Sequence, residues 1–223
     1  MKKIYFLLIA LCFFATTKAQ IINITDANFK AKLLASSPNN KIAKNLAGIY
    51  FKIDVNNNKE IEQSEALQVK ELYVDYSEIS SLNEIHFFQY LTHLYCTQNS
   101  IQSLDLNSNL YLSVLACSNN PLSSLDLTYN AQLTALFCSV TNINSLNLNN
   151  NTSLLYVDLD LNYFLRYLFI KNGQNEKFGN FNLTSITYIC CDDSQYNDVV
   201  SRFQFTMINN YCTFVPGGTF YKI

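Results

Sequence analysis

The sequence is poor in several residue types, and each shortage narrows the class of protein. Only 5 glycines and 3 prolines occur among 223 residues, which argues against a disordered or collagen-like chain. Charged residues make up 14% of the sequence and the formal net charge is −2, so we expect neither nucleic acid nor an anionic membrane surface as the main partner. Histidine occurs only at His86 and His93. Neither stands in a motif with a nucleophile or metal ligands, so we expect no enzyme activity.

One pattern repeats at a constant interval across the middle of the chain. Apolar residues recur at six fixed places in each copy, and a polar residue, usually Asn, follows each group of three. The copies begin at Leu91, Leu112, Leu133 and Leu154, so the period is 21. In the fourth copy the same spacing assigns Phe164, Tyr167 and Phe169 to core positions. A fixed period of this length indicates a solenoid, in which no single repeat can bury its apolar side alone.

The pattern Leu-x-x-Leu-x-Cys-x-x-Asn-x-Leu-x-x-Leu-x-Leu-x-x-Asn resembles the leucine-rich repeat. It is most similar to the bacterial nested class, in which two similar halves follow one another, and the resemblance covers residues 70–172. A helical period does not explain alternation such as Leu104-Asp105-Leu106. The preceding copy, from Leu72, is one residue longer and looks like the internalin-type repeat. The resemblance implies a β-rich leucine-rich repeat solenoid of about six repeats, with a parallel sheet on its concave face and short helical caps.

Residues beside the inward-pointing leucines are expected on the outer surface of that sheet, because side chains alternate along a strand. Several of them are aromatic, although no core demands it. The predicted binding surface consists of Tyr73, His93, Tyr95, Phe137, Tyr156 and Asp158. Exposed aromatic patches commonly mark recognition, whereas cross-strand stacking that only stabilises the sheet is the alternative.

The segment 1–19 is typical of a signal peptide. Lys2 and Lys3 precede an apolar stretch that is too short to span a bilayer, and Ala19 offers a small residue for cleavage before Gln20. A lipid anchor at Cys12 is the weaker alternative, because the bulky Leu11 precedes it. We therefore expect export to the periplasm, the cell surface or the medium, with no transmembrane segment after signal removal.

An N-terminal cap is expected over residues 20–70, followed by repeats over 71–193 and a C-terminal cap over 194–223. Thr25 is placed to cap a helix that begins at Asp26, with Phe29, Leu33 and Leu34 on its apolar face. Such a helix covers the open end of a solenoid core.

The segment 54–65 within this cap resembles an EF-hand calcium loop. Its expected ligands are Asp54, Asn56, Asn58, the carbonyl of Glu60, Glu62 at the ninth place and a bidentate Glu65. Lys59 replaces the usual glycine at position six, where it adds strain and a positive charge. A helix is expected over 65–69. A polar turn that binds no metal is the alternative, so the cofactor is calcium or none.

Six cysteines remain after signal removal. Cys96, Cys117 and Cys138 recur at one core position, and we expect them to be free buried thiols because their side chains run parallel. After Asn172 an insertion is expected over 174–182, and Ile186, Ile189 and Cys191 then restore the core pattern in a final strand. The acidic pair Asp192-Asp193 suits the start of a helix whose apolar face contains Tyr196, Val199, Val200 and Phe203.

The C-terminal segment resembles the cap of exported leucine-rich repeat proteins of the Bacteroidetes group. That resemblance rests on Cys190-Cys191-Asp192-Asp193 and on the segment Tyr211–Tyr221, and it implies a Cys190–Cys212 disulfide. Such relatives often continue into further domains and a sorting domain for type IX secretion. This sequence stops at Ile223 without them, which leaves release by other means, periplasmic residence or truncation open.

These features together favour a non-catalytic exported binding scaffold. We expect a protein or peptide partner on the concave face, with a glycan as second choice because stacked tyrosines also suit sugars. A structural envelope protein without a defined ligand is the third possibility. The fold follows from spacing and physics, whereas the function rests on analogy between folds.

Overall fold

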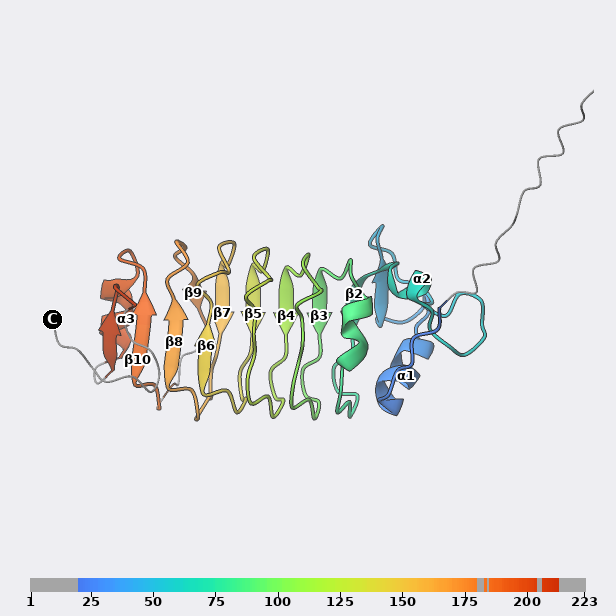
Figure 1. The fold of residues 1–223 in the computed structure, drawn as a ribbon, viewed down its shortest axis with the longest axis horizontal. Helices are drawn as coiled ribbons and strands as arrows, with labels where there is room; N and C mark the ends of the chain where they lie inside the picture. The colour runs from blue at the N-terminus through green and yellow to red at the C-terminus, as the bar shows by residue number, and fades with distance from the viewer. Residues whose placement is uncertain (1–19, 180–182, 184, 204–205, 213–223) are drawn as a thin grey trace, which may run out of the picture.

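The structure, a computed structural model, describes residues 20–179, 183, 185–203 and 206–212. The chain winds into an elongated stack of turns, with helix α1 (Ala27–Leu34) near one end and helix α3 (Tyr196–Arg202) at the other (Figure 1). The predicted signal peptide and Cys12 lie outside the described residues. Within the described ranges, no helix is both long and apolar enough to cross a membrane.

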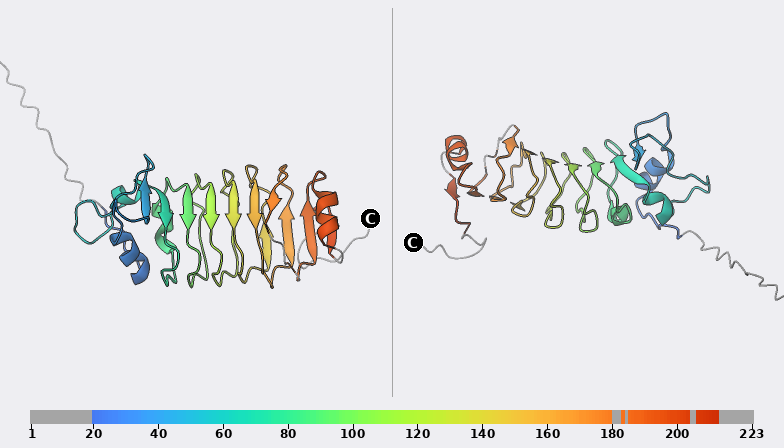
Figure 2. Two further views of the ribbon diagram at one scale, coloured as in Figure 1. Left: turned by 180° about the vertical axis from the view of Figure 1, so that it is seen from behind. Right: turned by 90° about the horizontal axis from the view of Figure 1, so that it is seen from above.

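Two sheets run along the stack. Viewed from above, the strands of the larger sheet line one side of the turns (Figure 2, right). Its seven strands, in spatial order, are β1 (Ala43–Asn45), β2 (Val69–Tyr73), β3 (His93–Tyr95), β4 (Val114–Ala116), β5 (Ala135–Phe137), β7 (Tyr156–Asp158) and β9 (Lys177–Phe178). All neighbouring pairs are parallel except β1 with β2. The second sheet contains β11 (Met207–Asn209), β10 (Tyr188–Cys191), β8 (Tyr167–Ile170) and β6 (Ser145–Asn147), all parallel. The predicted solenoid of about six turns is confirmed.

The strand register follows the leucine spacing. Leu94 pairs with Leu115, Leu115 with Leu136, and Leu136 with Val157, each step being one full repeat. All four side chains are 0% exposed. Each such burial contributes roughly 1.5–3 kcal/mol, so any one-residue slip that turned these side chains outward would be strongly disfavoured.

A row of asparagines, formed by Asn99, Asn120 and Asn162, fills the turns that follow the strands. Asn120 is buried, its Nδ2 donates to the carbonyls of Cys96 and Cys117 at 2.9 and 3.0 Å, and its Oδ1 accepts from the Ile101 amide at 3.0 Å. The residue just before this row is left-handed in each copy. The φ values of Gln98, Asn119, Val140 and Leu161 lie between 54° and 56°. At Thr141 the row lacks an amide, but Val140 keeps the same φ and the Thr141 hydroxyl donates to Asn162 Oδ1 at 2.7 Å.

The N-terminal cap differs in detail from the prediction. Helix α1 begins at Ala27, and Asp26, not Thr25, caps it, because its carboxylate accepts from the Phe29 amide at 2.8 Å. The other Asp26 oxygen accepts from the Ser80 amide, which joins the cap to the first repeat. Phe29 and Leu33 are fully buried, as expected. Helix α2 covers only Gln63–Ala66, so the predicted helix over 65–69 was wrong in its bounds; Val69 already belongs to β2.

The fourth copy is shifted by one residue in its second half. The predicted core residues Phe164, Tyr167 and Phe169 are replaced inside by Leu165, Leu168 and Ile170. Strand β8 sets this register. Leu146 pairs with Leu168, whereas the regular period of 21 would pair it with Tyr167. Phe164 is consequently 57% exposed. The prediction was wrong because both frames of this apolar stretch look equally suitable in sequence.

The prediction of an insertion after Asn172 is wrong, because the repeat continues there. Residues 177–178 of the supposed insertion form β9, which pairs with β7 at the regular repeat spacing. Strand β10 continues the second sheet through Leu168–Ile189 pairing, rather than the larger sheet, and β11 follows it, so β10 is not the final strand. Ile186, Ile189 and Cys191 are nevertheless buried, as predicted. The two nested halves have similar patterns, which is why the sequence did not identify the correct sheet.

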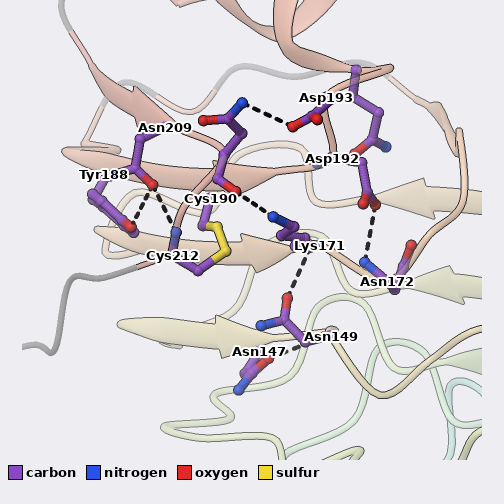
Figure 3. The surroundings of a disulfide bond; sticks show 12 residues. Asn147, Asn149, Lys171, Asn172, Tyr188, Cys190, Asp192, Asp193, Asn209 and Cys212 are labelled. Carbon is purple, nitrogen blue, oxygen red and sulfur yellow. Dashed lines mark hydrogen bonds between the residues drawn. A yellow bond between two sulfur atoms is a disulfide. The ribbon is translucent and has the colours of Figure 1, made fainter.

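The C-terminal cap is fastened to β10 by the Cys190–Cys212 disulfide, with 5.2 Å between the Cα atoms (Figure 3). Around it, Asn209 Oδ1 accepts from the Tyr188 hydroxyl and from the Cys212 amide, both at 3.0 Å. Helix α3 buries Val199, but Tyr196 and Val200 are largely exposed. Most of the predicted segment Tyr211–Tyr221, from residue 213 onward, lies outside the described residues.

The thiol column is also as predicted. Cys96, Cys117, Cys138 and Cys191 are free and buried. Burial raises the pKa of the Cys96 thiol, and the neighbouring Cys138 thiol together with burial raises that of Cys117. Since the thiolate is the reactive form, the raised pKa values make Cys96 and Cys117 unreactive core residues.

Candidate binding face and candidate metal loop

The predicted binding residues do share the outer face of the seven-stranded sheet. Register places Tyr73 beside Tyr95, and further along the sheet it places Ala135 beside Tyr156. All six predicted residues are partly exposed and none is fully exposed. They do not form one contiguous aromatic surface, because Val114 and the buried Ala116 of β4 separate them into two groups.

The first group lies over β1, β2 and β3. The rings of Tyr73 and Tyr95 are stacked with centroids 4.7 Å apart and an interplanar angle of 3°. Tyr50 packs on the other side of Tyr73 at 6.4 Å, and His93 stacks near Tyr95 at 6.3 Å. The stacking alternative is therefore realised here, and the neighbour of Tyr95 on β4 is the small residue Ala116.

A lysine and a glutamate hold the Tyr73 hydroxyl of this first aromatic group in place. Lys44 Nζ lies 2.8 Å from a Glu71 carboxylate oxygen, which also accepts from the Tyr73 hydroxyl. Burial and the adjacent Glu71 raise the pKa of Tyr73 to about 12. Burial lowers the pKa of His93, so this imidazole is neutral at pH 7. Tyr73 thus has its hydroxyl already occupied, and Tyr95 is the better placed of the two to contact a partner.

The second group lies over β5 and β7. The rings of Phe137 and Tyr156 are tilted with centroids 5.2 Å apart. Asp158 accepts from the Ser139 hydroxyl at 2.9 Å and from the Asp160 amide at 3.1 Å, so it orders the adjacent turn. A Cβ atom at Gly179 would approach the Tyr156 hydroxyl to 2.8 Å, so a larger residue there would displace the Tyr156 ring.

The predicted calcium ligands lie on the loop between β1 and β2. Glu62 and Glu65 are buried side by side at the start of α2, where Glu65 accepts from the amides of Val55 and Glu62 at 2.7 and 3.0 Å. Asp54 is also buried, and it accepts from the Asn58 amide at 3.1 Å. Lys59 has φ 65°, the left-handed conformation that glycine provides in an EF-hand loop.

The side-chain amides of Asn56 and Asn58 both donate hydrogen bonds to the Glu62 carboxylate. Asn56 Nδ2 donates to Glu62 Oε1 at 3.0 Å, and Asn58 Nδ2 donates to the same oxygen. The second oxygen, Glu62 Oε2, is buried without a hydrogen-bond partner. Burial and the neighbouring Glu62 raise the pKa of Glu65. The Glu60 side chain pairs with Lys30 at 2.6 Å.

The structure brings only part of the predicted ligand set together. Among the described residues, no group of three or more His, Cys, Asp or Glu side chains is arranged to hold a metal. Glu62 and Glu65 adjoin one another, whereas Asp54 accepts from the Asn58 amide and lies 3.8 Å from Lys52 Nζ. Any metal site here therefore needs the amide oxygens of Asn56 and Asn58 as well.

The sequence did not identify the most exposed aromatic side chains. They lie on turns, outside the strands on which the prediction concentrated. They are Tyr76, Tyr90, Tyr111, Tyr129, Tyr163, Phe164 and Tyr211. Among them, Tyr163 and Phe164 line a cleft at the end of β5 and β7. No sequence signal distinguished Phe164 from Leu165, because both frames of this stretch look equally suitable.

No protein-family model and no curated protein sequence matches the chain. Solved structures are similar to it. An internalin from Listeria monocytogenes superposes with a TM-score of 0.52 at 17% identity, over 84% of this chain and 58% of its own length. Internalin C2 from the same organism has a TM-score of 0.47 at 18% identity, over 75% of this chain and 74% of its own. The chain thus spans less than two thirds of the first internalin. At such identity the likeness concerns the fold, and the chain folds as a leucine-rich repeat solenoid similar to that internalin.

Proposed function

We propose that the protein is an exported, non-catalytic scaffold that binds a protein or peptide across the outer face of the seven-stranded sheet. The observation that carries this proposal is the pair of aromatic groups on that face, flanking the small residues of β4. Aromatic anchors around a shallow apolar centre are the usual composition of a recognition hot spot. The internalin-like fold is compatible with such a role and does not specify the partner.

Export is part of this proposal. The signal sequence predicts cleavage between Ala19 and Gln20, and the Cys190–Cys212 disulfide favours an oxidising compartment. Similarity of the C-terminal cap to exported proteins of the Bacteroidetes group supports the same destination. Intact-mass analysis of the protein expressed with its own N-terminus tests it. A mature chain that still begins with Met1 would contradict export by this route.

The binding face is tested with one double alanine variant and a matched control. Tyr95→Ala combined with Phe137→Ala removes one ring from each aromatic group, whereas Tyr129→Ala removes an exposed ring on a turn. We expect affinity capture from envelope extracts to retain a specific band with the wild type and the control, and to lose it with the double variant. Circular dichroism verifies folding. Equal capture by all three proteins would refute the proposed face.

We further propose that the loop 54–65 binds calcium through Asp54, Asn56, Asn58, Glu62, Glu65 and the Glu60 carbonyl. Two adjacent buried carboxylates, one with an unpartnered oxygen, call for a cation or a proton, and hard oxygen donors suit calcium. Calorimetric titration with calcium tests this, with magnesium as the competing ion and Glu65→Gln as the control. No heat at millimolar calcium would remove the site. Capture experiments repeated with and without calcium then show whether the ion affects partner binding.

A further inference from the structure

A second candidate site lies away from the sheet face, at the edge where β4, β5 and β7 end. A cleft of about 350 Å³ opens there between the turns of three consecutive repeats. Its walls include Asn119, Val140, Asn142, Leu161, Tyr163 and Phe164. Its volume is at the small end of the range for ligand pockets, about 300–1,000 Å³, so it would hold a small ligand or one end of a longer one.

Two of the wall residues occupy a backbone conformation that does not suit them. Val140 and Leu161 have φ values of 54° and 56°, and the equivalent residue one repeat earlier is Asn119 at 55°. Asparagine adopts the left-handed region readily, whereas a β-branched residue such as valine is a genuine outlier there. Since Asn119 shows that asparagine serves the same turn, the turn does not require valine or leucine. Strain of this kind is concentrated at functional sites.

The irregularity in the fourth repeat supplies the aromatic wall of the same cleft. The extra residue between Leu146 and Leu168 moves Phe164 out of the core, and Phe164 and Tyr163 are each 57% exposed. A regular repeat would have buried an apolar residue at this point, as Ile143 is buried one repeat earlier. A strained valine in a left-handed turn and a displaced aromatic ring therefore meet at one place on the surface.

The chemistry of the walls selects a neutral ligand that carries hydroxyl groups. No carboxylate, amine or guanidinium lines the cleft. The side-chain amides of Asn119 and Asn142 are exposed and make no hydrogen bond to any other described residue, so each offers both a donor and an acceptor. Exposed aromatic rings beside unpaired amides match a sugar ring, whose C–H face packs on an aromatic ring while its hydroxyls bond to amides. The sheet face differs, because Lys44, Glu71 and Asp158 place charges on it.

We propose that this cleft is a binding site for a neutral carbohydrate. It is independent of the proposed binding of protein on the sheet face, since the two sites share no residue. Tyr163 and Phe164 provide the stacking surface, Asn119 and Asn142 bond the hydroxyl groups, and Val140 and Leu161 form the apolar floor.

The test is a binding screen of the purified chain against neutral oligosaccharides (glucans, mannans, xylans and galactans) and acidic ones (alginate and polygalacturonate), followed by calorimetry. We expect binding of at least one neutral class and none of the acidic classes. Phe164→Ala should weaken it about tenfold or more, and Asn142→Leu should weaken it as well. Tyr129→Ala, an exposed ring outside the cleft, should leave the affinity unchanged, as should Tyr95→Ala on the sheet face.

Three outcomes would overturn the proposal. The first is no binding to any neutral oligosaccharide at millimolar concentration. The second is preferential binding of acidic oligosaccharides. The third is sugar affinity that survives Phe164→Ala but is lost in Tyr95→Ala, which would place the sugar on the sheet face. Because Phe164 and Asn142 are both exposed, these variants are expected to fold, and thermal unfolding verifies it. Loss of protein capture without loss of sugar binding would concern the sheet face alone.

Discussion

Position 59 offers a direct measurement of backbone strain in the candidate calcium loop. Lys59 is exposed and has φ 65°. An L residue in this region costs roughly 1–2 kcal/mol, and asparagine largely escapes that cost. Lys59→Asn should therefore stabilise the metal-free protein by about 1 kcal/mol. For a chain of this length, that corresponds to an increase in Tm of about 2–4 °C, which differential scanning calorimetry resolves.

Lys59→Ala is the matched control, because it removes the charge and keeps the Cβ atom and therefore the strain. Lys59→Gly also relieves strain, but the unfolded chain gains freedom worth about 0.5–1 kcal/mol, so its net stabilisation should be smaller. The expected order of Tm is Asn, then Gly, then Ala and wild type together. A Lys59→Asn variant that unfolds at or below the temperature of Lys59→Ala would refute the strain assignment.

Calcium affinity separates the charge from the strain at the same position. The left-handed φ is present without the ion, so its cost cancels when bound and free proteins are compared. The lysine charge does not cancel, because it repels the ion in the bound state only. Lys59→Ala and Lys59→Asn should therefore bind calcium equally and more tightly than the wild type, by about 1 kcal/mol or roughly fivefold. Titration calorimetry gives both constants, and unequal affinities for the two variants would show that the loop changes conformation on binding.

Three further predictions concern the solenoid and its C-terminal cap. Asn120→Ala should lower the free energy of unfolding in urea by about 2–4 kcal/mol, because two buried carbonyls and the Ile101 amide lose their partner. The control Asn107→Ala, on the exposed surface, should leave stability unchanged. Equal effects of the two variants would refute the role of the asparagine row. Replacing Cys190 and Cys212 by Ser should lower stability by about 3 kcal/mol, given their sequence separation of 22, and intact mass of the mature wild type should show four free thiols, whereas six would exclude the bridge. Burial raises the pKa of Glu176 above its ordinary 4.5. Its contribution to stability is therefore full below pH 4.5 and is lost as pH rises through the raised pKa. The Tm of the wild type should fall more steeply between pH 4 and pH 8 than the Tm of Glu176→Gln, and parallel curves would contradict this.

The sequence predicted the inward side of the molecule well. Leu94, Leu115 and Leu136 recur at a spacing that allows only one register with their side chains inside, so the strand positions and the core follow directly. The Asn120 row was predictable for a similar reason, because a turn after every strand leaves backbone groups that need a side-chain partner. The cap helix was misplaced by one residue, since Thr25 and Asp26 are both suitable caps and only the tertiary contact of Asp26 with Ser80 distinguishes them.

Elsewhere the pattern was compatible with more than one structure. Phe164 and Leu165 are both apolar, so the spacing alone could not decide which one is buried. Strand β9 contains a single apolar residue, Phe178, and its pairing is determined by the backbone of β7. The outer aromatic residues were correctly placed on one face. Their division into two groups depends on side-chain stacking, as between Tyr73 and Tyr95, and the sequence alone does not reveal such stacking.

Recognition in this fold is best sought at residues that neither packing nor hydrogen bonding requires. Residues that obey the repeat, such as Leu136 or Asn120, are already required by packing or by hydrogen bonding. Where the chain departs from the repeat at an energetic cost that folding does not require, another selective reason is needed. Val140 has such a cost because it is a β-branched residue at the left-handed position that Asn119 occupies one repeat earlier, and Phe164 has it in its exposed ring. Both line the same uncharged cleft. Since either departure could have been avoided independently of the other, their meeting at one site is better explained by a ligand than by tolerance of two unrelated defects.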